Sequence, residues 1–479
     1  MPAPSRAASG GPSNKVFRLA SRLVGARRLS SWHCVEALRQ YQRLDAAGSI
    51  RHFYRSLEIF PEDWRTWHHL SIVYSQLLGD LDESLRLLRY ARRLRERLPT
   101  PRGEKLPCRF LDYRWVAHVG HIANMDHLIK REILQGRDPK RLILHLPPSH
   151  APANRALLEK MATHISIIED EEKLPYPLDA MFSVLEEYYL CESIDGLTKH
   201  WWHASSEILR AWEQAGHGPL LAHTAEELQR GRAGLKTLGV PDGAWFVCLH
   251  VRESGFKREQ GYSEVEAVLN ADIESYLPAM RAIIERGGWV IRVGDPKMQP
   301  LPALPRTIDY ARSTLKSDWM DVFLLGSCRF FIGTSSGPAY IPPLFGIPCV
   351  LTNWAPTGQR PFNGRDLYIP KRFQAGAPPR ELGFSEMMAP PLGYAPRYVL
   401  ADALGLAPIP NTSEEIREVV SEMLDRADGA LCYSRQDEAL QSAFDAVAET
   451  NLCIGNARIG RAFLRKYRRL LFGSTQRGD

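Results

Sequence analysis

The stretch FFIGTSSGPAYIPPLFGIPCVLTN at positions 330–353 has the pattern of a strand, a turn of small residues, a short helix and a second strand. Its run Gly-Thr-Ser-Ser-Gly at 333–337 places hydroxyls and unhindered N–H groups at a helix start, where the helix dipole favours an anion. Pro338 suits the first helical position, because its missing N–H would have no intrahelical partner there. The pattern indicates a phosphate-binding turn suited to the diphosphate of a nucleotide-sugar. An ordinary tight turn is the alternative, since short glycine motifs are weak evidence.

Alternating strands and helices surround this turn. In the carboxyl half we expect strands at 245–251, 289–294, 307–310, 330–334 and 349–353. The expected helices lie near 272–286, 318–327, 338–345 and 413–425, the last with a capping pair in Thr412 and Glu415. The amino half has expected strands at 114–120, 141–146 and 165–169 and expected helices at 121–135 and 154–163. Two Rossmann-like halves in tandem predict an α/β fold with a cleft at the carboxyl ends of the strands.

Residues 33–98 are predicted to be helical throughout, and their spacing is similar to that of a tetratricopeptide repeat. Phe53 and Pro61 match the aromatic residue and the terminating proline of one unit. Trp67, Leu70 and Tyr74 match the core of the next unit. An array this short is not expected to be stable alone. It is either a platform for a protein or membrane partner or a helical cap on the domain that follows.

The charge of the chain is concentrated at its ends. The first 35 residues carry six basic side chains and no acidic one, and residues 455–479 carry seven basic side chains and one acidic one. Because the body between them is acidic overall, a nucleic-acid groove through the body is disfavoured. Residues 458–472 have the pattern of an interfacial helix for an anionic membrane surface. The alternative is a helix that packs its apolar stripe on the body. For residues 1–30 the alternatives are a disordered tail and a mitochondrial transit peptide.

These patterns divide the 479-residue chain into five segments. They are a basic, disordered tail at 1–32, a tetratricopeptide-like region at 33–105, an acceptor domain at 106–240, a nucleotide-sugar domain at 241–430, and helices with a basic tail at 431–479. Neither an apolar run of membrane-spanning length nor a secretory signal is visible, so we expect a cytoplasmic protein, at most peripheral to the inner face of the membrane. The eight cysteines are scattered and without metal-ligand spacing, which predicts free thiols and no metal cofactor.

The candidate donor-binding residues lie at the predicted strand ends of the carboxyl half. Arg252, two residues after His250, could bind a diphosphate with two donors and stabilise the charge of the leaving group, although a surface salt bridge with Glu253 is the alternative. Arg292 lies within an apolar strand and must therefore find an acid or a phosphate. The remaining donor-binding candidates in this half are His250, Gly294, Asp295, Asp309, Tyr310, Ser335, Ser336, Gly337 and Pro338. Asp295 could instead be a helix cap or the partner of that arginine, whereas Asp309 and Tyr310 could contact a nucleoside.

The candidate acceptor-side residues follow the expected first strand of the amino half. Gly120 would permit close approach of an acceptor, and His121 could act as a general base on its hydroxyl. A histidine at a helix start is also a common cap or packing residue, and Glu253 and Asp126 are rival bases. The predicted catalytic residues are therefore Arg252, His121 and Glu253.

These residues together resemble a family of bacterial glycosyltransferases of surface-carbohydrate clusters and, more distantly, fucosyltransferases and heptosyltransferases. The resemblance covers about residues 110–425 and implies a GT-B fold, a nucleotide-sugar donor on the carboxyl half and no essential metal. His250-x-Arg252 looks like the fucosyltransferase signature whose arginine binds the donor diphosphate. Ser336-Gly-Pro-Ala-Tyr340 looks like a heptosyltransferase turn in which Tyr340 replaces a histidine, so a heptose donor does not follow.

Three functions are compatible with these observations. The first is metal-independent transfer of a hexosyl or deoxyhexosyl group from a nucleotide-sugar to a glycan, lipid-linked glycan or protein, in surface polysaccharide biosynthesis. The second is a nucleotide-sugar epimerase of the same fold. The third is a helical-repeat scaffold with a degenerate transferase body, which would bind a protein partner through residues 33–98.

Overall fold

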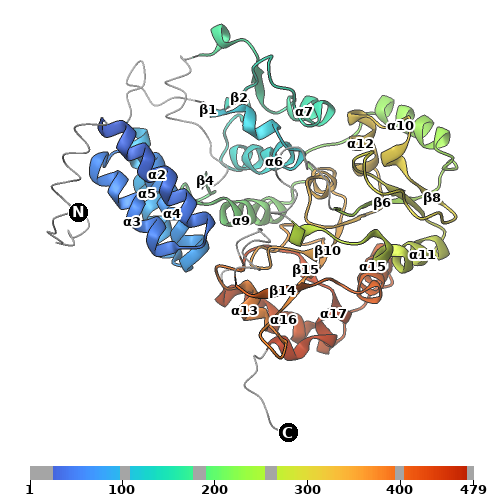
Figure 1. Ribbon diagram of the computed structural model, residues 1–479. Coiled ribbons are helices and arrows are strands. Elements are labelled where there is room, and N and C mark those ends of the chain that lie inside the picture. The colour runs from blue at the N-terminus through green and yellow to red at the C-terminus, as the bar shows by residue number, and fades with distance from the viewer. Residues whose placement is uncertain are drawn as a thin grey trace. The chain divides into compact units, whose positions relative to one another are not determined.

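The computed structural model describes residues 25–97, 108–175, 190–253, 267–393, 404–451 and 453–471 (Figure 1). The chain divides into two compact units, Met1–Leu98 and Pro99–Asp479. The expectations for a disordered tail before residue 25 and for residues 472–479 lie outside the described residues.

Unit 1 is helical, as the sequence predicts. Its helices are α2 (Ala26–Gln42), α3 (Ala46–Ile59), α4 (Trp64–Val73), the π-helical turn η1 (Tyr74–Leu78) and α5 (Leu81–Glu96). The carboxylates of Asp45, Asp63 and Asp80 cap the last three α-helices by accepting backbone N–H groups. Helix α2 begins at Ala26, so residues 26–32, which the sequence prediction placed in the basic tail, are helical. The tetratricopeptide assignment stays a prediction.

The amino part of unit 2 contains a three-stranded parallel sheet in the order β1 (Arg109–Leu111), β2 (Leu142–His145), β3 (Ser166–Ile168). The helices α6 (Val119–Leu134) and α7 (Arg155–Met161) connect these strands. The expected first strand at 114–120 is wrong. Asp112 caps a 3-10 turn, η2 (Tyr113–Val116), and α6 already begins at Val119. Trp115 and Val116 are apolar because they are buried in this turn, not because they form a strand.

The carboxyl part contains a seven-stranded parallel sheet in the order β15-β11-β10-β9-β6-β7-β8. Five of its strands confirm the sequence prediction: β6 (Phe246–His250), β7 (Trp289–Arg292), β8 (Thr307–Ile308), β9 (Phe331–Gly333) and β10 (Cys349–Trp354). Counted from β6, the first six strands have the order 3-2-1-4-5-6 of a doubly wound Rossmann sheet. The chain moves from β6 to β7 on one side and returns to β9 on the other. The topological switch point therefore lies between β6 and β9.

Two strands of this sheet come from segments in which the sequence predicted none. They are β11 (Leu367–Pro370) and β15 (Arg458–Ile459), which pair in parallel. A second sheet is antiparallel and has the order β13 (Arg380–Glu381), β12 (Arg372–Ala375), β14 (Leu406–Ile409). A small hairpin joins β4 (Leu190–Glu192) to β5 (Thr198–His200).

The remaining helices pack around these sheets. They are α9 (Trp201–Gln214), α10 (Ala225–Thr237), α11 (Leu277–Glu285), α12 (Asp318–Leu325), α13 (Phe384–Met388), α15 (Ser413–Ala427), α16 (Arg435–Thr450) and α17 (Arg461–Lys466). The capping box of Thr412 and Glu415 is present at the start of α15, as the sequence predicts. Among the described helices, none is both long and apolar enough to cross a bilayer. All eight cysteines are free thiols.

The basic segment at 458–471 packs on the rest of unit 2. The apolar side chains of Ile459, Phe463, Leu464, Leu470 and Leu471 are all buried in the core. Five of its basic side chains pair with acids of other elements, as Arg465 does with Asp437 and Lys466 with Glu415. Ion pairing and burial thus occupy both faces of the segment, which is the alternative that the sequence left open.

Candidate functional site

The carboxyl ends of β6 and β9 are joined by hydrogen bonds at the switch point. The N–H of Arg252 donates to Thr334 Oγ1 at 3.1 Å, and the N–H of Thr334 donates to His250 O at 3.3 Å. Thr334 is wholly buried, so this junction is shielded from water. It aligns the residue after β6 with the small-residue turn after β9, where open α/β sheets bind their ligands.

The small-residue turn is held from β10 as well. Ser335 Oγ accepts the N–H of Ala355 at 3.2 Å. Ser336 has an extended backbone, and its buried Oγ has no hydrogen-bond partner among the described residues. The expected helix at 338–345 is two 3-10 turns, η9 (Gly337–Tyr340) and η10 (Pro342–Phe345), with Pro338 near the start of the first. Because one turn carries few aligned peptide dipoles, the dipole argument for anion binding loses most of its weight here.

The amino end of α6 lies directly against this turn. A Cβ on Gly337 would lie 3.2 Å from Gly120 N, and a Cβ on Gly120 would lie 3.4 Å from both Gly337 Cα and the Tyr340 ring. The two predicted glycine motifs, 217 residues apart in the chain, therefore meet backbone to backbone. His121 lies in the same first turn of α6, where its Nδ1 is 3.1 Å from Arg114 O.

A second cluster of predicted residues is joined by a buried ion-pair network behind the strand ends. The wholly buried guanidinium of Arg292 donates from Nε and Nη2 to Asp309 Oδ1, and from Nη1 to Gln299 O at 2.8 Å. Glu253 Oε1 lies 3.8 Å from Arg292 Nη1, and its Oε2 accepts the N–H of Gln299. Asp309 Oδ2 accepts the N–H of Leu301. The partner of Arg292 is thus an acid, Asp309, which is one of the two kinds of partner expected for a buried arginine.

Gly294 and Asp295 shape the loop after β7. Gly294 has a φ of +143°, and a Cβ there would lie 2.4 Å from Met298 Sδ, so only glycine fits. Asp295 Oδ1 accepts the N–H of Lys297, as a turn-capping carboxylate does. Tyr310 is wholly buried, and its hydroxyl is bonded to the backbone of Ser317. A buried ring cannot stack on a nucleoside in this conformation, so the proposed donor site omits Tyr310.

Asp126 lies two turns further along α6 than Gly120. Its carboxylate is buried, forms an ion pair with Lys130 at 2.7 Å and has a pKa raised by burial. With His127 and Tyr340 it lines a small hollow of about 20 Å³, which is room for one water molecule. Asp126 is therefore already paired with Lys130, which makes it a weak candidate for a base on the acceptor.

His250 is the last residue of β6 and lies at the switch point. Its Nδ1 lies 3.1 Å from Val293 O, and burial lowers the pKa of the imidazole to about 4. It is therefore neutral at physiological pH and donates a hydrogen bond from Nδ1. Among the described residues, no group of three or more His, Cys, Asp or Glu side chains is arranged to hold a metal ion.

Lys371 is a buried residue near this edge that the sequence analysis missed. It directly follows β11, and its Nζ donates to the carbonyls of Val268 and Asn270. The N–H of Ala271 in turn donates to Arg252 O at 2.9 Å, and burial lowers the pKa of Lys371 to about 8. In the sequence, a lysine directly after a short apolar run gives little indication of a buried functional residue. Its position at the strand ends follows only from strand β11, which was not predicted.

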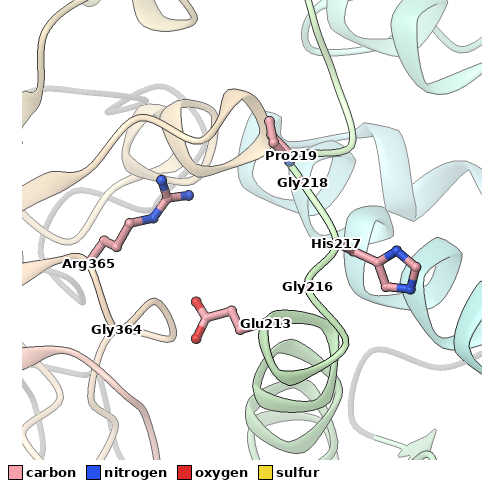
Figure 2. A pocket seen from close by; sticks show the side chains of 7 residues that line it. All are labelled: Glu213, Gly216, His217, Gly218, Pro219, Gly364 and Arg365. Carbon is pink, nitrogen blue, oxygen red and sulfur yellow. The ribbon is translucent and has the colours of Figure 1, made fainter.

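A larger hollow lies away from these residues. It has a volume of about 350 Å³ and is lined by Glu213, Gly216, His217, Gly218, Pro219, Gly364 and Arg365. Figure 2 shows Glu213 extending from the end of α9 towards the loop at Gly364, with the His217 ring turned away. None of the predicted site residues lines it.

Comparison with known proteins gives only distant structural similarities. No protein-family model matches the chain, and no curated protein matches it. A glycosyl transferase of family 9 from Veillonella parvula DSM 2008 is 10% identical, with a TM-score of 0.33 over 50% of this chain and 79% of that one. The ADP-heptose lps heptosyltransferase II of E. coli is 12% identical, with a TM-score of 0.32 over 51% and 84%. The dodecameric iron-containing heptosyltransferase TibC, in complex with ADP-D-beta-D-heptose, is 12% identical, with a TM-score of 0.29 over 52% and 58%. Similarities of this size do not assign the chain to a family.

Proposed function

We propose that this protein is a glycosyltransferase of the GT-B type that binds the diphosphate of a nucleotide-sugar at the β6–β9 switch point. The observation that carries the proposal is the junction of Arg252 with Thr334, in which the backbone N–H of the arginine is bonded to the turn of hydroxyl and glycine residues. Arginine suits a diphosphate because it offers several donors in one plane. Ser336 supports the same reading, since its buried Oγ is a donor without a protein partner in the described part of the chain.

The transfer itself would be a substitution at the anomeric carbon. The bond from the anomeric carbon to the diphosphate oxygen breaks, and the nucleoside diphosphate leaves with the electron pair. The acceptor oxygen forms the new bond and loses its proton. Arg252 would stabilise the departing charge, and α6, which begins opposite the turn, would contribute the positive end of a 16-residue helix.

His121 is the proposed acceptor-side base. Its contact with Arg114 O places the proton on Nδ1 in the neutral ring, so that Nε2 is the basic nitrogen. Glu253 is the weaker candidate, because its carboxylate already accepts the N–H of Gln299 and lies beside Arg292. In this proposal Arg292 and Asp309 support the strand ends from behind. Stabilisation of the leaving-group charge by Arg252 and the start of α6 requires no metal.

In the same proposal, unit 1 is a platform for a protein partner.

The proposal is tested by thermal shift with the diphosphates GDP, UDP, ADP and TDP and with CMP. At least one nucleotide is expected to raise the Tm, and Arg252→Ala is expected to abolish that shift. Arg286→Ala is the matched control, since Arg286 pairs with Asp425 on the surface away from the switch point. A full panel without a shift, or a shift that survives Arg252→Ala, would contradict the proposal. Product analysis without an acceptor excludes the epimerase if the nucleotide-sugar is recovered unchanged.

A further inference from the structure

Asn353 has an unusual backbone at the carboxyl end of β10. Its φ is +50°, in the left-handed region that residues other than glycine rarely occupy. The pairing of β10 with β11 shifts register between Leu351 and Trp354, so the strand bulges around this residue. Strained residues and bulges of this kind are common beside functional sites.

The surrounding structure holds Asn353 in this conformation through reciprocal hydrogen bonds. Its N–H donates to Asn411 Oδ1, and the N–H of Asn411 donates to Asn353 Oδ1 at 2.8 Å. Asn411 also donates from Nδ2 to Pro370 O at 2.9 Å, and Asn353 donates from Nδ2 to the hydroxyl of Tyr276. Both asparagines are buried. The left-handed residue is therefore fixed to the segment before α15 and to the end of β11.

The backbone that leaves Asn353 reaches the small-residue turn. Two residues later, the N–H of Ala355 donates to Ser335 Oγ at 3.2 Å. One residue earlier, Thr352 Oγ1 donates to Gly333 O at 3.4 Å and shares a 2.6 Å hydrogen bond with Tyr276. Bonds from both sides of Asn353 thus end on residues 333–335. A change of φ at Asn353 would redirect the chain at the first of these contacts.

We propose that Asn353 is a positioning residue: its left-handed backbone, held by Asn411, sets the turn at residues 334–337 in the orientation that binds the donor diphosphate. The statement that the turn binds the donor diphosphate rests on the proposed function, whereas the positioning of the turn by Asn353 does not. Glycine at this position keeps the conformation without the amide, and alanine disfavours it. This difference separates the backbone role of Asn353 from its side-chain bonds.

Hydrogen–deuterium exchange on the ligand-free protein tests the positioning. Asn353→Ala is expected to raise amide exchange in a peptide covering residues 331–337 about tenfold, because the turn would open more often. Asn353→Gly is expected to give a smaller increase. Leu470→Ala is the control for global destabilisation, because Leu470 is buried far along the chain in the carboxyl-terminal segment. If Asn353→Ala changes exchange in this peptide no more than Leu470→Ala does, or no more than Asn353→Gly does, the proposal is wrong.

Nucleotide affinity, measured by calorimetry on folded protein, tests the link to the donor. Asn353→Ala is expected to weaken binding of the best nucleotide diphosphate about tenfold, with Asn353→Gly in between and Leu470→Ala unchanged. Unaltered affinity in Asn353→Ala, despite faster exchange of the turn, would refute the link alone. If the unmodified protein binds no nucleotide, the proposed function fails, while the exchange experiment still decides whether Asn353 positions the turn.

Discussion

The N–H of Arg252 donates to Thr334 Oγ1 at 3.1 Å, and this bond joins the two strands between which the sheet order reverses. Thr334→Val removes the acceptor at nearly constant volume and leaves a buried N–H unpaired. We expect a loss of about 1–3 kcal/mol in the free energy of unfolding, measured by urea titration. Nucleotide binding should weaken in parallel. Thr334→Ser keeps the hydroxyl and should preserve nucleotide binding. Equal losses of nucleotide affinity in both variants would contradict this prediction, because they could not be caused by loss of the hydrogen bond.

The close contact of Gly337 with Gly120 predicts the effect of added side chains. Gly337→Ala places a Cβ 3.2 Å from Gly120 N, so α6 and the turn must separate by a few tenths of an ångström. We expect a Tm lower by several degrees, the typical effect of overpacking by 1–3 kcal/mol, and weaker nucleotide binding. Gly218→Ala is the control, because a Cβ at Gly218 meets no atom within 4 Å. A Gly337→Ala protein with unaltered Tm and affinity would show that the two elements do not need this contact.

The buried pair of Arg292 and Asp309 predicts a large loss of stability when only one partner is changed. Arg292→Met leaves the carboxylates of Asp309 and Glu253 together without their cation. The expected cost is about 3–5 kcal/mol in urea unfolding. The double variant Arg292→Met with Asp309→Asn should lose less than the sum of the two single variants, because one of the two uncompensated charges is removed. Strict additivity would indicate that the two side chains are not coupled.

The buried imidazole of His250 predicts a dependence of stability on pH. Its folded pKa is about 4, below the ordinary 6.5, so the unfolded chain binds the proton more tightly. The stabilisation by neutral His250 is present above pH 6.5 and is lost as the pH falls towards 4, by up to about 3 kcal/mol. His250→Asn keeps a donor for Val293 O but cannot titrate. Its Tm should fall less steeply than that of the unmodified protein between pH 6.5 and 4, and parallel curves would contradict the assignment.

Several features of the fold follow from local patterns in the chain. The mostly apolar runs of β6, β7, β9 and β10 predicted these strands to within one or two residues, because a strand buried on both faces is rich in apolar residues. The Thr412–Glu415 cap was predictable for a different reason: its two hydrogen bonds form within four residues of the chain. The strand expected at 114–120 was wrong because the apolar residues of a buried 3-10 turn have the same local pattern as those of a strand.

The sequence by itself therefore determined the α/β class, the helical first unit and the small-residue turn at 333–337, all of which depend on neighbours along the chain. The tertiary structure decided what depends on distant partners. It paired β15 with β11, supplied Asp309 to Arg292, buried the basic segment at 458–471 and brought Gly120 against Gly337. Such contacts join residues far apart in the chain, and their free energy comes from burial and charge pairing that no local pattern encodes.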